Sequence, residues 1–175
     1  MKKNIIAASL FSLLTLTGST VASTGDIQFN GVVTSTTCDV KPSVGGAVNN
    51  LIQLGTVAPS AQGSLVNFSL KPDISQNGCS ALTSTNVVTI SWTGTFNANG
   101  LAAQSGAATD AWTEIKHTNA TGAATTINAT SLSSSIAGDK FIESSGQGAL
   151  FTAQLNGGSK PGDYQAAAAY MIAYN

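Results

Sequence analysis

Short runs in which every second residue is apolar recur along this chain, and they constrain its fold more than any other feature. A period of two places successive side chains on opposite faces of a β-strand, so each run predicts a strand with one face to bury. The runs are Val66, Phe68 and Leu70; Val88, Ile90 and Trp92; a weaker set of Thr113, Ile115 and His117; Phe151, Ala153 and Leu155; and the alternate residues from Tyr164 to Tyr174. Turn-forming pairs separate them: Gly45-Gly46, Asn77-Gly78, Asn99-Gly100, Thr121-Gly122 and Asn156-Gly157. Many short strands at this spacing predict an all-β sandwich.

The stretches between the runs are rich in small and polar residues. Residues 97–110 are predicted to be a surface loop, and so are residues 122–139, with a short helical or strand turn near Ile127. In the last run, the four alanines from Ala166 to Ala169 also suit a helix. The alternating aromatic residues and the Pro161-Gly162-Asp163 approach favour a strand over residues 164–174.

The first 22 residues have the organisation of a secretory signal peptide. Lys2 and Lys3 form a positive start, an apolar run extends from Ile5 to Leu16, and the small-x-small sequence at Thr20–Ala22 suits cleavage. A membrane anchor is the alternative, but the run is short and rich in Ser and Thr. We therefore expect residues 1–22 to be removed and the mature chain to be exported, with cleavage after Ser23 also open.

The charge of the mature chain is low. Removal of Lys2 and Lys3 leaves five Lys against eight acidic residues, a formal charge of 5 − 8 = −3, and there is no Arg. This composition lacks the basic footprint of a nucleic-acid-binding protein and the polybasic patch of a membrane-surface protein. A single domain of this length is long enough to bury a core.

A further alternating segment lies at the newly exposed N-terminus. Its odd positions are Gly25, Ile27, Phe29, Gly31 and Val33, and the polar residues Asp26, Gln28 and Asn30 lie between them. The pattern describes a strand with one apolar face at a free chain end. Because chain ends fray unless they are docked, this segment must pair within its own domain or with a neighbour.

Cys38 and Cys79 are the only cysteines of the chain. In an exported protein we expect them to form a disulfide, because two Cys and a single His do not make a zinc site. The bond closes a loop of about forty residues, which the chain-entropy model values at roughly 4 kcal/mol. We expect it to join two early strands at one end of the sandwich, with Cys38 following the first of them.

No set of residues suggests catalysis, a metal site or a cofactor. His117 is the only histidine and lies in a strand-like run, so we expect a structural role for it. No nucleophile elbow, zinc-protease helix or phosphate loop is present. Glu114 and Lys116 are predicted to share a solvent-facing surface with Trp112, which could stack on a sugar but more simply packs half-buried.

The order and spacing of several motifs resemble the pilin subunits of chaperone–usher fimbriae along the whole mature chain. The markers are the N-terminal segment from Gly25 before Cys38, then Leu51-Ile-Gln-Leu-Gly-Thr-Val, then Phe68-Ser-Leu-Lys-Pro before Cys79. Gly162-Asp-Tyr-Gln and the terminal Tyr170-Met-Ile-Ala-Tyr-Asn complete them. The resemblance implies an incomplete immunoglobulin-like β-sandwich lacking its last strand, formed by residues 34–175 and preceded by a donor-strand arm, residues 23–33, that runs into the first strand.

The resemblance also implies how such a chain assembles. The arm of one subunit fills the groove left by the missing strand in the next, and a periplasmic chaperone fills that groove before assembly at an outer-membrane usher. The donor side chains would be Gly25, Ile27, Phe29, Gly31 and Val33, with Gly31 at a position where a tiny residue meets a shallow pocket; a bulge is the alternative for Gly31. The acceptor edge and chaperone contact would comprise Tyr164, Tyr170, Ile172, Tyr174 and the terminal carboxylate of Asn175.

The predicted function is therefore a structural, non-enzymatic subunit of a surface fimbria that supports bacterial adhesion, with host glycans as further partners. Two alternatives remain open at this point. One is a minor or adhesive fimbrial subunit, and the other is a self-contained exported β-sandwich that binds carbohydrate and uses the arm to complete its own fold.

Overall fold

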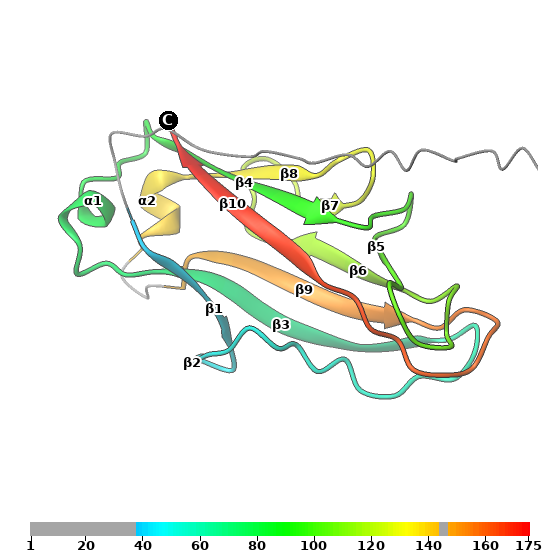
Figure 1. Ribbon diagram of the computed structural model, residues 1–175. Coiled ribbons are helices and arrows are strands. Elements are labelled where there is room, and N and C mark those ends of the chain that lie inside the picture. Colours follow the sequence, from blue (N-terminus) through cyan, green and yellow to red (C-terminus); the bar gives the residue numbers. More distant parts are fainter. Residues whose placement is uncertain (1–37, 144–146) are drawn as a thin grey trace, which may run out of the picture. The chain divides into compact units, whose positions relative to one another are not determined.

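The computed structural model describes residues 38–143 and 147–175. They form an all-β sandwich of two open sheets (Figure 1). The larger sheet has the order β2 (Ala47–Val48), β1 (Val40–Val44), β3 (Gln62–Pro72), β9 (Ala149–Asn156), β6 (Trp112–His117) and β5 (Leu101–Ala102). A further strand, β7 (Thr125–Ile127), pairs with β6. The smaller sheet has the order β10 (Ala168–Tyr174), β4 (Val87–Gly94) and β8 (Ser133–Ala137). All of these pairs are antiparallel.

The core lies between the two sheets, and the alternating residues of the sequence fill it. Phe68, Trp92 and Phe151 pack together, with Phe68 stacked on Phe151 at 5.2 Å and Trp92 edge-on to Phe151 at 5.4 Å between ring centroids. Val88 and Ile90 of β4 are fully buried in the same core cluster. The expected strand runs in β3, β4, β6 and β9 are therefore confirmed, together with their inward faces.

The outward face of β6 is also as expected. Trp112, Glu114 and Lys116 are half-buried and alternate with buried neighbours, and Lys116 lies 3.7 Å from Glu114. Trp112 packs half-buried on this face.

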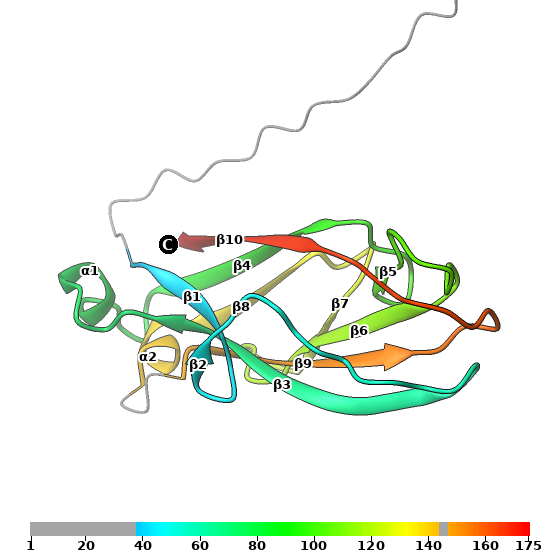
Figure 2. The same cartoon turned by 60° about the horizontal axis from the view of Figure 1, so that its bottom comes forward.

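Two short helices and a disulfide occupy one end of the sandwich (Figures 1 and 2). Cys38 is bonded to Cys79 of α1 (Asn77–Ser80), and the second helix, α2 (Gly138–Phe141), follows β8. The expected disulfide is confirmed. Cys38 lies just before β1, the first strand that the structure describes, and the strand expected ahead of Cys38 falls outside the described residues. β1 itself was not expected, because Pro42 interrupts the alternation of Val40 and Val44.

The C-terminal strand begins later than the sequence indicates. β10 starts at Ala168, not at Tyr164, because the preceding residues bond to the loop around residue 105 instead of to β4. Gln165 forms a bridge with Ser105, and the Gln104 side chain both donates to and accepts from the Ala167 backbone at 2.9 and 3.0 Å.

The loop expected over residues 122–139 contains two strands. The turn anticipated near Ile127 is β7, but β8 was not anticipated. Its inward position Ser134 carries a hydroxyl in place of an apolar side chain, so only Ile136 marks the buried face. The loop expected over residues 97–110 includes only the two-residue strand β5.

His117 explains why Ser134 faces inward. The imidazole is fully buried and stacks on Phe151 at 4.6 Å between centroids. Its Nε2 lies 3.0 Å from Oδ1 of Asn119, which is an acceptor, so we place the ring proton on Nε2. Nδ1 then accepts from the Ser134 hydroxyl at 2.8 Å, and the neutral ring links β6 of the larger sheet to β8 of the smaller one.

Burial lowers the pKa of His117 to about 4, while its hydrogen bond to Asn119 acts in the opposite direction. The folded-state pKa is thus below the unfolded value of about 6.5, so the unfolded chain takes up the proton first. The stability associated with neutral His117 is present in full above pH 6.5 and is lost as the pH falls toward 4.

We therefore expect the free energy of unfolding to fall by about 1.4 kcal/mol per pH unit between roughly pH 6 and pH 4.5, the slope for one proton. Urea unfolding of the mature protein at several pH values measures it. The His117→Gln variant, which cannot titrate, should be less stable at pH 7 but nearly flat over this range. An unchanged slope in that variant would assign the dependence to another group.

Candidate subunit-binding groove

β10 is an edge strand whose inward side chains are incompletely covered. One edge pairs with β4 over its full length, from Ala168 opposite Gly94 to Tyr174 opposite Val88. Within residues 38–143 and 147–175, no strand pairs with the other edge. Tyr170, Ile172 and Tyr174 pack against the core but stay half-exposed, whereas their β4 partners are buried. Within the described residues, the smaller sheet therefore ends at β10 with one strand edge unpaired.

The opposite wall of this region consists of β1 and the extended segment after it. Residues 51–58 belong to neither sheet. Ile52 and Leu54 from this segment and Val40 and Val44 from β1 are partly buried against the same core as the β10 side chains. β10 on one side, and β1 with residues 51–58 on the other, therefore flank one apolar part of the core, which we call the groove.

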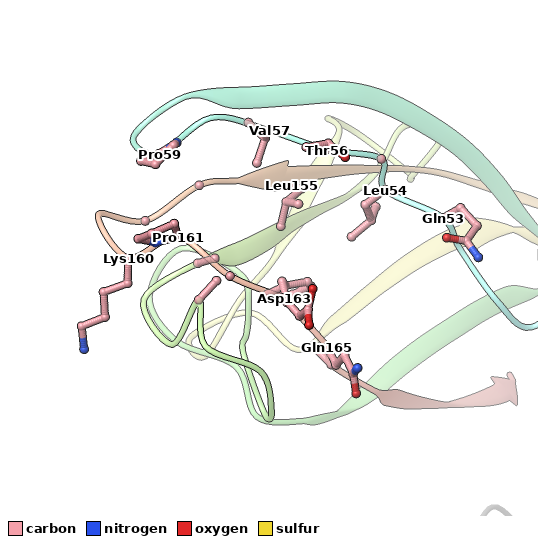
Figure 3. Close-up of a pocket in the computed structure, with 18 of the residues that line it drawn as sticks. Gln53, Leu54, Thr56, Val57, Pro59, Leu155, Lys160, Pro161, Asp163 and Gln165 are labelled. Carbon is pink, nitrogen blue, oxygen red and sulfur yellow. The ribbon is translucent and has the colours of Figure 1, made fainter.

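At its end away from the disulfide, the groove opens into a pocket of about 900 Å³ (Figure 3). One wall is formed by Leu51–Val57 and Pro59, and the other by Lys160–Ala166. Ala108, Ala111 and Leu155 form a buried floor, on which Leu54, Val57 and Tyr164 pack. Figure 3 shows Leu54, Val57 and Leu155 directed toward the common space, while the Lys160 side chain points away from it. The pocket is apolar where it is deepest.

Asp110 fixes the turn that forms one pocket wall. Its carboxylate accepts from the Ser159 backbone and hydroxyl at 2.8 and 2.7 Å and from the Lys160 backbone at 3.2 Å. These bonds, that of the Ser159 hydroxyl first, lower the pKa of Asp110 to about 2. Gly158 permits this approach, because a Cβ there would overlap the Asp110 carboxylate.

Two tyrosines span the narrower end of the groove. The Tyr170 hydroxyl donates to the Val40 carbonyl at 3.1 Å, and the Tyr174 hydroxyl donates to the Cys38 carbonyl at 2.9 Å. Burial raises the pKa of Tyr170, and burial with the nearby Asp39 charge and Tyr170 raises the pKa of Tyr174 to about 12. Both hydroxyls therefore remain donors over the ordinary pH range.

The residues predicted for the acceptor edge meet in this region, with one difference in role. Tyr170, Ile172 and Tyr174 lie on β10, and Asn175 follows it. Tyr164 precedes β10 and lines the pocket; its hydroxyl donates to the Leu101 carbonyl at 2.9 Å and accepts from Thr113 at 2.9 Å. Burial raises its pKa as well.

The predicted donor residues Gly25, Ile27, Phe29, Gly31 and Val33 lie outside the described residues, as do residues 1–22. Sequence reasoning missed the part played by residues 51–58 as a groove wall. The sequence signal for this wall is the motif that starts at Leu51, which does not by itself indicate a place in the fold.

No group of three or more His, Cys, Asp or Glu side chains within the described part of the chain is placed to hold a metal ion. None of its helices is long and apolar enough to cross a membrane.

The two-sheet fold defines an all-β sandwich of the immunoglobulin-like kind, and the chain belongs to the family of fimbrial proteins. It is 39% identical over 172 residues to the F107 fimbrial protein of Escherichia coli, covering 98% of this chain and 99% of that protein. It is 31% identical over 183 residues to the K99 fimbrial protein of Escherichia coli, covering 99% of each. No protein-family model matches the chain.

Removal of the disulfide should destabilise the domain at the narrow end of the groove. Because the bond spans 41 positions, we expect the Cys38→Ala, Cys79→Ala double variant to lose roughly 4 kcal/mol of unfolding free energy. Guanidinium unfolding of both proteins at pH 7 measures the difference. Unmodified protein unfolded under reducing conditions is the control and should match the variant; equal stability of reduced and oxidised protein would contradict the expectation.

Proposed function

We propose that this chain is a structural subunit of a surface fimbria and polymerises by donor-strand exchange. The observation that carries the proposal is the open edge of β10, with its half-exposed apolar side chains facing a groove. Extended segments add to such edges by main-chain hydrogen bonds, and alternate side chains fill the pockets beside them. Membership of the fimbrial protein family supports a partner that is another fimbrial subunit.

The arm, residues 23–33, has the length and pattern that this groove requires. Five apolar-face positions run from Gly25 to Val33, and five half-buried positions run from Ala166 to Tyr174. Each set spans nine residues, about 30 Å of extended chain. Ile27 and Phe29 would contribute most, at roughly 1.5–3 kcal/mol each for full burial.

An antiparallel arrangement gives a specific register. The arm would then continue the antiparallel smaller sheet, and Gly25 would lie opposite Tyr174, Phe29 opposite Tyr170 and Val33 opposite Ala166. This places Gly25, which has no side chain, beside the bulky Tyr174. It also brings Val33 to the pocket that Ala166 lines.

Head-to-tail use of this contact does not close on itself, so it generates an open filament. Before assembly the uncovered groove is an aggregation hazard, which is why we include a periplasmic chaperone and delivery to an outer-membrane usher in the proposal. In this proposal residues 1–22 direct export, residues 23–33 are the arm, and residues 34–175 are the pilin domain.

Deletion of residues 23–32 separates this proposal from a self-contained carbohydrate-binding sandwich. We expect the shortened chain to be recovered in complex with a chaperone and to form no polymer, as judged by size-exclusion chromatography. A soluble, stable monomer without the arm and without a chaperone would contradict the polymer proposal.

A charge on the apolar face of the arm should block assembly. In the Phe29→Glu variant a carboxylate would have to enter the groove, so we expect loss of surface fimbriae with the chaperone complex intact. Electron microscopy of cells and co-purification with the chaperone measure the two effects. Gln28→Glu places the same charge on the opposite face and should still assemble; loss of both assembly and chaperone binding in Phe29→Glu would refute a donor role for Phe29.

The register predicts which residues can be cross-linked between subunits. Gln28 of the arm would face outward opposite Met171 of β10, so the Gln28→Cys, Met171→Cys variant should give a ladder of covalent oligomers on a non-reducing gel. The Gln28→Cys, Ala169→Cys variant is shifted by two residues and should cross-link far less. A stronger ladder from the second pair would move the register by two positions.

A further inference from the structure

The two tyrosine hydroxyls bond to acceptors that a neighbouring strand would otherwise use. The Asp39 carbonyl accepts from the Asp73 backbone at 2.8 Å on the β3 side. Successive carbonyls of an extended chain point to opposite edges, so those of Cys38 and Val40 point toward the edge of β1 that pairs with β2 only at Ser43 and Val44. There they accept from Tyr174 and Tyr170. The side chains of β10 thus supply donors to the part of this edge that β2 leaves unpaired.

The acceptor end of these bonds is held from several directions. Cys38 is tied to α1 by the disulfide. Gln76, next to α1, accepts from the Asp39 backbone at 2.9 Å and donates to the Asp39 carboxylate at 2.7 Å. Together with the Asp73 bond, these contacts fix the backbone that presents the Cys38 carbonyl.

The donor end is fixed as well. The Asn175 and Val87 backbones exchange hydrogen bonds at 2.8 and 3.0 Å, immediately after Tyr174. The Tyr174 ring lies edge-on to Phe141 of α2 at 6.4 Å, and the Tyr170 ring lies 6.0 Å from Trp92. A hydroxyl held at both ends defines the separation of β10 and β1.

We propose that Tyr170 and Tyr174 form a brace that fixes the width of the groove for an incoming strand and leaves β10 as the edge to which that strand can pair. The proposal rests on the proposed function, since it assigns these residues a positioning role for the incoming arm. The arm can pair with β10 but not with the occupied carbonyls of β1, so a single alignment is favoured. A preset groove also avoids an ordering cost when the arm arrives.

The hydroxyls, and not the rings, carry this role. Replacement of Tyr by Phe leaves the ring to fill the same space but deprives the Val40 or Cys38 carbonyl of its donor. We therefore expect the variants to fold and to be captured by the chaperone, yet to present a groove of less defined width.

The test uses the full chain, exported together with its fimbrial chaperone and usher, with the rate of incorporation into fimbriae followed by pulse-labelling. Tyr170→Phe and Tyr174→Phe should each slow incorporation roughly five-fold, since a hydrogen bond contributes about 1 kcal/mol. Thr118→Val is the matched control, because it also removes one hydroxyl bond to a backbone carbonyl, at 3.1 Å to Leu150, away from the groove. It should lower thermal stability somewhat less, because the Thr118 backbone still donates to the same carbonyl at 2.8 Å, and it should not slow incorporation.

A second variant separates the brace from a general loss of stability. Gln76→Ala keeps both hydroxyls but loosens their acceptor, so it should slow incorporation, and adding Tyr174→Phe to it should slow it little further. Fully additive effects would overturn the brace, as would Tyr variants that assemble at the rate of Thr118→Val or faster than the unmodified chain. If the Tyr variants do not accumulate, the single Gln76→Ala variant decides: slowed incorporation supports the brace, and an unchanged rate overturns it.

The Phe29→Glu variant distinguishes the two proposals. If it abolishes fimbriae while the Tyr variants behave like the control, donor-strand exchange stands and the brace is wrong. If Phe29→Glu assembles normally, the proposed function itself fails.

Discussion

The structure depends on a pairing that is made on one side only. β10 bonds to β4 along its full length and contributes half-buried aromatic side chains to the core, but within the described residues its second edge has no strand partner. The apolar core therefore reaches the edge of the smaller sheet at β10, where no further described strand covers it. Exposed strand edges and large apolar patches are features that soluble proteins usually avoid. Their combination here makes sense if the edge is a binding surface, and the pocket between residues 51–59 and 160–166 continues it.

The sequence predicted the strands whose inward faces are purely apolar. The prediction failed for strands whose position depends on hydrogen bonds between polar side chains or the backbone. β3, β4 and β9 follow from simple alternation. β8 was missed because Ser134 faces inward to satisfy His117, a partner 17 residues away that no local pattern reveals. The predicted start of β10 was wrong for a similar reason. Gln104 and Ser105, in a loop distant in the sequence, form hydrogen bonds with residues 165–167.

The candidate site was predictable in its residues but not in its geometry. Alternation and position at the chain end singled out Tyr170, Ile172 and Tyr174, and the structure brings them to one edge strand. That two of their hydroxyls would cross to β1 could not be predicted, because the acceptors are backbone carbonyls whose direction depends on the β1–β3 register. Residues 51–58 form one wall of the groove although they belong to no strand. Their sequence therefore carries no strand pattern that would indicate this role.

The position of the disulfide ties stability to this edge. In the proposed assembly the last strand comes from another subunit, so before assembly the wall opposite β10 lacks the support that a complete sheet provides. The bond to α1, the Gln76–Asp39 pair and the Asp73 backbone bond act on the residues immediately before β1, where Tyr174 attaches. Cross-links that constrain the unfolded chain stabilise a fold wherever they lie. One placed beside the open groove also limits how far the groove can relax when it is empty, and this gives the Cys38–Cys79 pair a reason for its location as well as for its presence.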